Sequence, residues 1–241
     1  MYYYLIIALQ GFCVYHCYSH RNSYYWILTI IFLPVVGCVL YLFTNVFRKR
    51  DIEKVQESLE TVINPSKRIK DLEKKFKFSG TFENQVALAD AYLNEGMYTD
   101  AITNYEGSLK DVFLNDFYAI SKLVEAYYYS SDFKKAIENA ERIEENQMFR
   151  KSKASFLYGL ALEKAGNLAK AEKVLRTFDA PYSNYGERLE LGRFLIRHSK
   201  TGEAKGIYLE MISESENMSR NSYRINREFI KKVKEEQALL V

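Results

Sequence analysis

Residues 154–178 read ASFLYGLALEKAGNLAKAEKVLRTF, and this stretch decides the fold. Alanine, leucine, glutamate and lysine dominate it, and these residues favour the α-helix. The pair Ala165-Gly166 interrupts the run, because glycine is a poor helix former that permits tight turns. The stretch therefore predicts two short helices joined by a turn.

The same pattern occurs four times along residues 82–213. An alanine opens the second helix each time, at positions 101, 136, 171 and 204, so the spacings are 35, 35 and 33 residues. Alanine suits these positions because we expect the two helices to cross most closely there, where only a small residue fits. The predicted turns fall at Glu95-Gly96, Ser131-Asp132, Ala165-Gly166 and Thr201-Gly202.

This pattern resembles the tetratricopeptide repeat, a helix–turn–helix unit of about 34 residues. The resemblance implies an all-α fold in which about four repeats build an α-solenoid with flanking helices. A small residue on three of the four first helices fits it, namely Ala89, Gly159 and Gly192. Two features depart from the family pattern: every repeat lacks its tryptophan, and Val124 stands where the second repeat should have a small residue.

Apolar residues at helical spacing predict further helices on both sides of the repeats. They cover residues 51–62, 66–77 and about 219–239, and the last would cap the open end of the solenoid. We therefore divide the chain into a transmembrane hairpin (1–47), leading helices (48–80), the repeats (81–213) and a capping helix (214–241).

The N-terminal part is apolar and carries little charge. Two apolar runs, Tyr2–Tyr18 and Tyr24–Phe47, are separated by a short polar linker. The second run exceeds the roughly 20 residues that a membrane-spanning helix needs, whereas the first could span or lie in the interface. A cleaved signal peptide is the alternative, but the chain opens without a basic residue. The prediction is a transmembrane helical hairpin that places residues 2–47 in a lipid bilayer.

Basic residues predict the orientation of this hairpin. Arg48-Lys49-Arg50 follows the second run directly, whereas the linker holds only Arg21. The positive-inside rule then places the soluble part in the cytoplasm, at an inner (plasma) membrane. Residues 51–241 contain 30 basic residues (34 minus 4) against 31 acidic ones. Because this near-neutral part lacks a basic surplus, we expect no nucleic-acid partner.

The second run contains a tryptophan, an apolar stretch, Pro34-Val-Val-Gly37 and then Leu40-Tyr41. This order resembles the phospholipase D-nuclease N-terminal module, the two-helix segment at the N-terminus of cardiolipin synthases. The resemblance covers roughly residues 3–46. Pro34 and Gly37 are expected to kink the helix or to allow a close helix approach.

The sequence predicts neither an enzyme nor a cofactor. Phospholipase D chemistry needs H-x-K-x4-D, but His198-Ser199-Lys200 is followed by Lys205 at the aspartate position. Cys13, His16, Cys17 and His20 would share a helix face, yet ligands strung along two turns cannot surround one metal ion. No phosphate-binding or dinucleotide-binding glycine loop is present.

The resemblance to tetratricopeptide repeats instead implies a protein or peptide partner on the concave face, which residues of the first helices line. The candidate binding residues are Tyr118, Glu125, Tyr128, Tyr129, Phe156, Arg193 and Arg197. Tyr128 and Phe156 could instead pack between neighbouring helices. A carboxylate clamp is not expected, because Val86, Asp90 and Leu157 occupy its positions. The prediction is a membrane-anchored scaffold at the cytoplasmic face of a bacterial inner membrane, and the alternative is an accessory subunit of a membrane enzyme.

Overall fold

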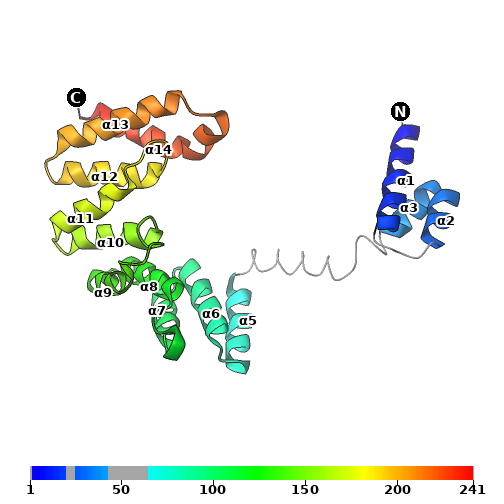
Figure 1. Cartoon of the computed structure of the whole chain (residues 1–241), viewed down its shortest axis with the longest axis horizontal. Helices are drawn as coiled ribbons and strands as arrows, with labels where there is room; N and C mark the ends of the chain where they lie inside the picture. Colours follow the sequence, from blue (N-terminus) through cyan, green and yellow to red (C-terminus); the bar gives the residue numbers. More distant parts are fainter. Residues whose placement is uncertain (1, 20–24, 43–64, 241) are drawn as a thin grey trace. The chain divides into compact units, whose positions relative to one another are not determined.

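The computed structural model describes residues 2–19, 25–42 and 65–240, and all regular secondary structure in these ranges is helical (Figure 1). The predicted all-α class is thus confirmed for them. The chain divides into two compact units, Met1–Lys67 and Arg68–Val241. Residues 20–23 of the polar linker, the basic cluster at 48–50 and the helix expected over 51–62 lie outside the described residues.

The described residues of the first unit form the helices α1 (Tyr2–Ser19), α2 (Tyr25–Phe32) and α3 (Pro34–Tyr41). They enclose a small core of side chains with no solvent exposure, made of Cys13, Cys17, Ile30, Cys38 and Tyr41. The ring nitrogen Nδ1 of His16 lies 2.9 Å from the hydroxyl of Tyr41, which connects α1 to α3.

The second apolar run is broken at Leu33, whose backbone (φ −124°, ψ 77°) is not helical. Pro34 follows it and has no N–H group to donate to the carbonyl of Ile30. The side-chain amide of Gln10 donates to that carbonyl instead, at 3.0 Å. Gly37 lies so close to the carbonyl of Thr29 that a Cβ atom there would collide with it. The predicted kink is therefore a complete break.

No helix within the described ranges combines the length and the apolar character needed to cross a membrane. The sequence predicts a spanning helix over residues 24–47, with a kink or a close helix approach at Pro34 and Gly37. The spanning helix is wrong for residues 25–42, where the structure has two helices of eight residues each. The physical reason is the missing backbone donor of Pro34, which ends the ladder of hydrogen bonds.

The second unit is a row of helix pairs that follow one another in chain order (Figure 1). The pairs are α6 (Phe82–Asn94) with α7 (Tyr98–Ser108), α8 (Phe117–Tyr129) with α9 (Phe133–Ile143), α10 (Lys153–Lys164) with α11 (Leu168–Leu175), and α12 (Tyr185–Arg197) with α13 (Thr201–Glu216). Helix α5 (Pro65–Phe78) precedes them and α14 (Arg220–Ala238) follows, where the sequence predicts helices over 66–77 and 219–239. Short 3₁₀ turns occupy Asp111–Phe113 and Arg176–Phe178.

Each pair is joined by the same tight turn. The residues with positive φ in these turns are Gly96, Ser131, Gly166 and Ser199, at spacings of 35, 35 and 33. The fourth turn was predicted at Thr201-Gly202, and this prediction is wrong because both residues lie inside α13. In all four turns the residue with positive φ lies five positions before the alanine that opens the second helix. In the fourth turn that residue is Ser199, and Gly202 lies three positions further on, inside α13.

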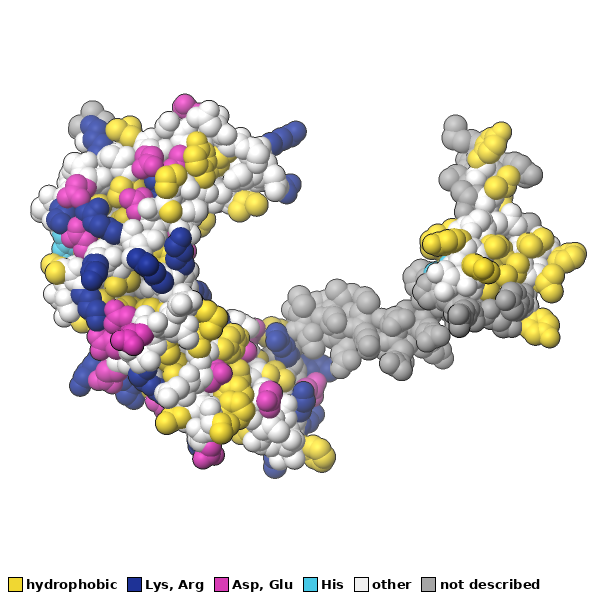
Figure 2. All heavy atoms as spheres, in the orientation of Figure 1, with side chains coloured by type: hydrophobic (Ala, Val, Ile, Leu, Met, Phe, Trp, Pro, Cys, Tyr) yellow, Lys and Arg dark blue, Asp and Glu magenta, His cyan; other side chains and the backbone are white. Residues whose placement is uncertain are grey.

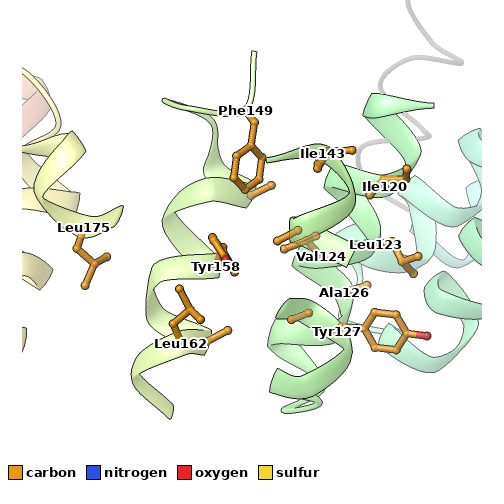
Figure 3. Packing of buried hydrophobic residues seen from close by; sticks show 14 of the residues in the cluster. Ile120, Leu123, Val124, Ala126, Tyr127, Ile143, Phe149, Tyr158, Leu162 and Leu175 are labelled. Carbon is orange, nitrogen blue, oxygen red and sulfur yellow. The ribbon is translucent and has the colours of Figure 1, made fainter. Parts of the chain in front are cut away.

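The core depends on matched small and large residues within each pair. Gly159 lies against Leu175, and Gly192 lies so close to the ring of Tyr208 that a Cβ atom would overlap it. The four alanines that open the second helices are completely buried, at positions 101, 136, 171 and 204. Figure 3 shows buried side chains, among them Val124, Tyr158 and Leu162, filling the space between α10 and the α8–α9 pair. The core is thus continuous from one pair to the next.

Candidate functional site

The seven predicted binding residues lie on the first helices of three pairs. Tyr118, Glu125, Tyr128 and Tyr129 are on α8, Phe156 is on α10, and Arg193 and Arg197 are on α12. We call the surface that α6, α8, α10 and α12 present away from their second helices the first-helix face. The structure brings Tyr118, Glu125 and Tyr129 into a tyrosine–lysine cluster. Arg193 and Arg197 form ion pairs, and Tyr128 and Phe156 belong to neither group.

Glu125 lies at the centre of the tyrosine–lysine cluster, which contains Tyr118, Lys122, Glu125, Tyr129 and Lys153. Its carboxylate is almost completely buried and binds two ammonium groups, that of Lys122 at 3.0 Å and that of Lys153 at 2.9 Å. Lys122 is one turn before Glu125 on α8, and Lys153 is the first residue of α10. A buried carboxylate needs such cationic partners because burial without them is costly.

The two lysines also lie over tyrosine rings. The ammonium of Lys153 is 5.2 Å from the ring centroid of Tyr129, and that of Lys122 is 5.8 Å from the ring of Tyr118. Both distances allow a cation–π interaction. Burial acts to lower the pKa of Lys153, but the hydrogen bonds to Glu125 and Tyr129 and the negative charge of Glu125 together raise it above its ordinary value. The cluster therefore presents charged lysines beside two exposed aromatic rings.

Tyr118 is further held by Asp90 on α6. Its hydroxyl donates to Oδ2 of Asp90 at 3.0 Å, while Tyr105 donates to Oδ1 at 2.5 Å. Burial and the neighbouring Asp90 raise the pKa of Tyr118 to about 12, so its hydroxyl stays protonated at neutral pH. Tyr118 remains 48% exposed although its hydroxyl is fixed. A fixed and exposed aromatic ring is well suited to contact a partner at a small cost in entropy.

Tyr128 is less exposed to solvent, and so less accessible to a partner, than its neighbour Tyr129. It is partly buried against the core and packs edge-on against Tyr129 and Phe133, with ring centroids 5.6 and 5.7 Å apart. Phe156 is also partly buried and meets Phe178 edge-on at 5.4 Å. These two side chains therefore contribute to packing between helices as well as to the face.

The two arginines of α12 already have carboxylate partners. Arg193 donates from Nε to Glu236 of α14 at 2.8 Å and from Nη1 to Glu190 at 2.5 Å. Arg197 forms a fork with Glu163 of α10, with both distances at 2.8 Å. The pKa of Glu163 is lowered, because these hydrogen bonds and one to His198 outweigh the effect of burial. Both arginines tie neighbouring helices together and neither carries uncompensated charge.

Sequence reasoning missed Lys122 altogether as a member of the site. Lys122 could have been found from the sequence, because it lies three residues before Glu125 and this spacing places both side chains on the same side of a helix. The partners of the arginines gave no such signal, since Glu236 is 43 residues from Arg193 and Glu163 is 34 residues from Arg197.

The cysteine and histidine side chains of α1 belong to the first unit. Cys13 and Cys17 are core residues, His16 contacts Tyr41, and His20 lies outside the described residues. Across the described part of the chain, no three His, Cys, Asp or Glu side chains are arranged to hold a metal ion.

Residues 6–44 match the phospholipase D-nuclease N-terminal family, which is generally membrane-associated. The predicted resemblance of the N-terminal segment is therefore confirmed, although the match ends before the helix pairs begin. No curated protein matches the chain.

Proposed function

We propose that this protein is a membrane-associated scaffold: its helix pairs are tetratricopeptide repeats that form an α-solenoid, and its first-helix face binds a protein or peptide partner. The observation that carries the binding role is the tyrosine–lysine cluster. It combines two partly exposed tyrosine rings, which hydrogen-bond, ring and cation–π contacts hold in place, with charged lysines. Tyrosine is common at interface hot spots.

The repeat assignment is supported by features that recur in register. The alanines, the turn residues with positive φ and the small–large core pairs all follow the spacing of 35, 35 and 33 residues. Repeats of this kind stack into solenoids whose first helices line one face, a surface suited to peptides or helices. Helix α14 covers the end of the row with its buried Ile230 and Val233.

The membrane role rests on the first unit. Besides the family match, α1 to α3 expose large apolar side chains over much of their described surface (Figure 2). Exposed apolar patches of this kind mark interaction with membranes or proteins. The basic residues Arg48, Lys49 and Arg50 support attachment at the cytoplasmic face of an inner membrane, because anionic lipids attract such clusters.

Flotation with lipid vesicles tests this attachment. We expect the full-length protein to float with vesicles of phosphatidylethanolamine and phosphatidylglycerol. Leu28, Ile31 and Phe32 are at least half exposed, and changing all three to lysine should reduce the bound fraction at least about hundredfold, since each large apolar side chain contributes roughly 1.5–3 kcal/mol on burial. Lysine at the exposed Val112 and Met148 of the second unit is the control. Equal flotation of all variants would contradict the proposal.

Replacing Tyr118 and Tyr129 tests the partner-binding face. The partner is first identified by co-purification with the full-length protein extracted in mild detergent. We then expect Tyr118→Ala and Tyr129→Ala each to weaken it by about 2 kcal/mol, roughly thirtyfold, because each removes an exposed anchoring ring. Tyr118→Phe keeps the ring and removes the hydroxyl that donates to Asp90, so this variant separates the contribution of the ring from that of the hydrogen bond.

Tyr182→Ala is the matched control, since Tyr182 is 59% exposed in a turn between helix pairs. Circular dichroism must show unchanged helicity in every variant. Unaltered partner recovery by a folded double variant would reject the first-helix face. The second candidate function, an accessory subunit that docks on a membrane enzyme through the exposed apolar side chains of the first unit, would then explain the binding.

A further inference from the structure

Helix α5 carries an excess of basic side chains on its exposed surface. Residues 68–78 contain five basic and two acidic residues, and all seven are exposed. Ile69, Leu72 and Phe76 pack the other side of the helix against the core of the second unit. The packing of the helix pairs therefore leaves the basic side chains of α5 in solvent.

Three of these basic residues form a lysine stripe along the helix. Lys70, Lys74 and Lys77 follow one another at spacings of four and three residues, which places them on one side of an α-helix. Lys74 meets Asp71 in an exposed ion pair at 3.3 Å, and such surface pairs are weak. Within the described part of the chain, Lys70 and Lys77 form no ion pair. The lysine stripe is thus largely uncompensated.

Phe78 follows the lysine stripe at the end of α5. It is 93% exposed, more than any other large apolar side chain of the described residues. The helix dipole favours basic residues in the last turn, which holds Lys75 and Lys77, but it explains neither Lys70 nor an aromatic ring in water. Lysines beside an exposed aromatic ring suit a membrane surface, where the lysines meet anionic headgroups and the ring enters the interface.

The place of α5 in the chain favours lipid over other anionic partners. It is the first described helix after the family match, which ends at residue 44. The 21 positions from residue 44 to Pro65 (65 minus 44) extend over at most about 75 Å, so a first unit bound to a bilayer keeps α5 within this reach of the lipid. Such a tether raises the effective concentration of lipid headgroups around α5.

Helix α14 provides a comparison within the same unit. It contains six basic and three acidic residues, so its excess of three positive charges equals that of residues 68–78. It lies at the other end of the row of helix pairs (Figure 1). Charge alone therefore does not distinguish the two helices, whereas the tether to the first unit does.

We propose that α5 binds the surface of an anionic membrane: Lys70, Lys74 and Lys77 contact lipid phosphates, and the ring of Phe78 inserts into the interface. This second contact attaches the row of helix pairs to the bilayer at its α5 end. The inference rests on the proposed membrane attachment of the first unit and adds a lipid site on the second.

Tryptophan fluorescence in the full-length protein tests whether residue 78 touches lipid. Trp26 is the single tryptophan of the chain, so Trp26→Phe/Phe78→Trp has one reporter, at the end of α5. The variant is mixed with vesicles of phosphatidylethanolamine and phosphatidylglycerol that carry brominated acyl chains, and only the floated fraction is measured. We expect bromine to quench the fluorescence in these vesicles, and to quench it far less when phosphatidylcholine replaces phosphatidylglycerol, because the surface then lacks negative charge.

Neutralising the lysine stripe should abolish this contact. Adding Lys70→Gln, Lys74→Gln and Lys77→Gln should lower the ratio of quenched to unquenched tryptophan about a hundredfold, since each lysine near an anionic surface contributes about fivefold. Glutamine has nearly the helix propensity of lysine, so α5 should stay folded, and circular dichroism checks this. The matched control neutralises three exposed basic residues of α14 and should leave the quenching unchanged. Its substitutions are Arg224→Gln, Arg227→Gln and Lys231→Gln.

A second reporter separates contact by α5 from contact by the whole second unit. Val112 is 88% exposed, so Trp26→Phe/Val112→Trp should remain unquenched in the same vesicles. Equal quenching of the reporters at positions 78 and 112 would overturn the inference. Equal quenching in the two lipid mixtures, or equal effects of the α5 and α14 substitutions, would overturn it too.

The outcomes also separate this inference from the proposed function. A protein that floats while Phe78→Trp stays unquenched would overturn the contact of α5 and leave the attachment of the first unit standing. A protein that does not float would reject both. Binding of a fluorescent RNA oligonucleotide that requires the lysine stripe, without quenching in the floated protein, would assign the stripe to nucleic acid and overturn the lipid site.

Discussion

Replacing Arg188 with methionine is expected to lower the free energy of unfolding by about 3–5 kcal/mol. Arg188 of α12 has no solvent-exposed surface, and its guanidinium contacts three acidic residues. Nε lies 2.9 Å from Asp179, and Nη1 lies 2.9 Å from Glu214 of α13. Nη2 is 3.2 Å from Glu210, within ion-pair distance but without hydrogen-bond geometry. Methionine fills similar space but leaves buried Glu214 without its cation.

The pH dependence of this effect follows from Glu214. Burial disfavours its charge, but hydrogen bonds from Tyr185, Arg188 and the backbone of Tyr182 lower its pKa below the ordinary value. A lowered pKa stabilises the fold above the unfolded value of roughly 4.3, and this contribution is lost as the pH falls through the folded pKa. In Arg188→Met, the unpaired Glu214 can take up a proton. The difference in stability between variant and wild type should therefore shrink on acidification.

Urea unfolding of the full-length protein in mild detergent, followed by circular dichroism, measures this prediction. The double variant Arg188→Met/Glu214→Leu should recover part of the loss, because it removes both charges. Arg224→Met on the exposed surface of α14 should change stability by no more than about 0.5 kcal/mol. A loss below about 1 kcal/mol for Arg188→Met would show that the buried ion network contributes little to the fold.

The local pattern was enough to predict most helices of the second unit. Alanine spacing predicted the four second helices, and these alanines are completely buried. The amphipathic spacing of Ile69, Leu72 and Phe76 predicted α5. A glycine normally marks such a turn, so the sequence pattern predicts the fourth turn at Gly202, which is wrong. The register of the repeat, five residues before the alanine, is the stronger constraint, and Ser199 can meet it.

The contacts that connect helices far apart in sequence could not be predicted in the same way. Burial of Arg188 contradicts the usual exposure of charged residues, and its partners lie 9 to 26 residues away. The roles of Arg193 and Arg197 likewise depend on glutamates of other helices. In the first unit, hydropathy indicated one long helix, whereas the missing donor of Pro34 divides it and the side chain of Gln10 satisfies the freed carbonyl.

The small–large pairs of the core predict a compensating exchange between two repeats. The residues are 16 positions apart in every pair, as in Val124 with Ala140 and Gly159 with Leu175. In the α8–α9 pair the larger residue, Val124, is thus on the first helix. In the α10–α11 pair the larger residue, Leu175, is on the second helix. The larger residue at Val124 is thus matched by a small residue, Ala140, 16 positions further along the chain, and both are completely buried.

Gly159→Val alone is expected to lower the free energy of unfolding by about 1–3 kcal/mol, because a Cβ atom would lie 2.8 Å from Cδ2 of Leu175. Leu175→Ala alone should lower it by about 2–5 kcal/mol, since Leu175 is almost completely buried and removal of its side-chain atoms would leave a cavity. The double variant reproduces the Val124–Ala140 pair, and its loss should be smaller than the sum of the single losses by at least about 1 kcal/mol. Urea unfolding of all three variants measures this coupling.

Gly159→Val combined with Ala204→Gly, which changes a different helix pair, is the control and should show simple additivity. Additive losses for Gly159→Val with Leu175→Ala would mean that the two positions do not form a complementary pair, and the common register of the repeats would lose its main support.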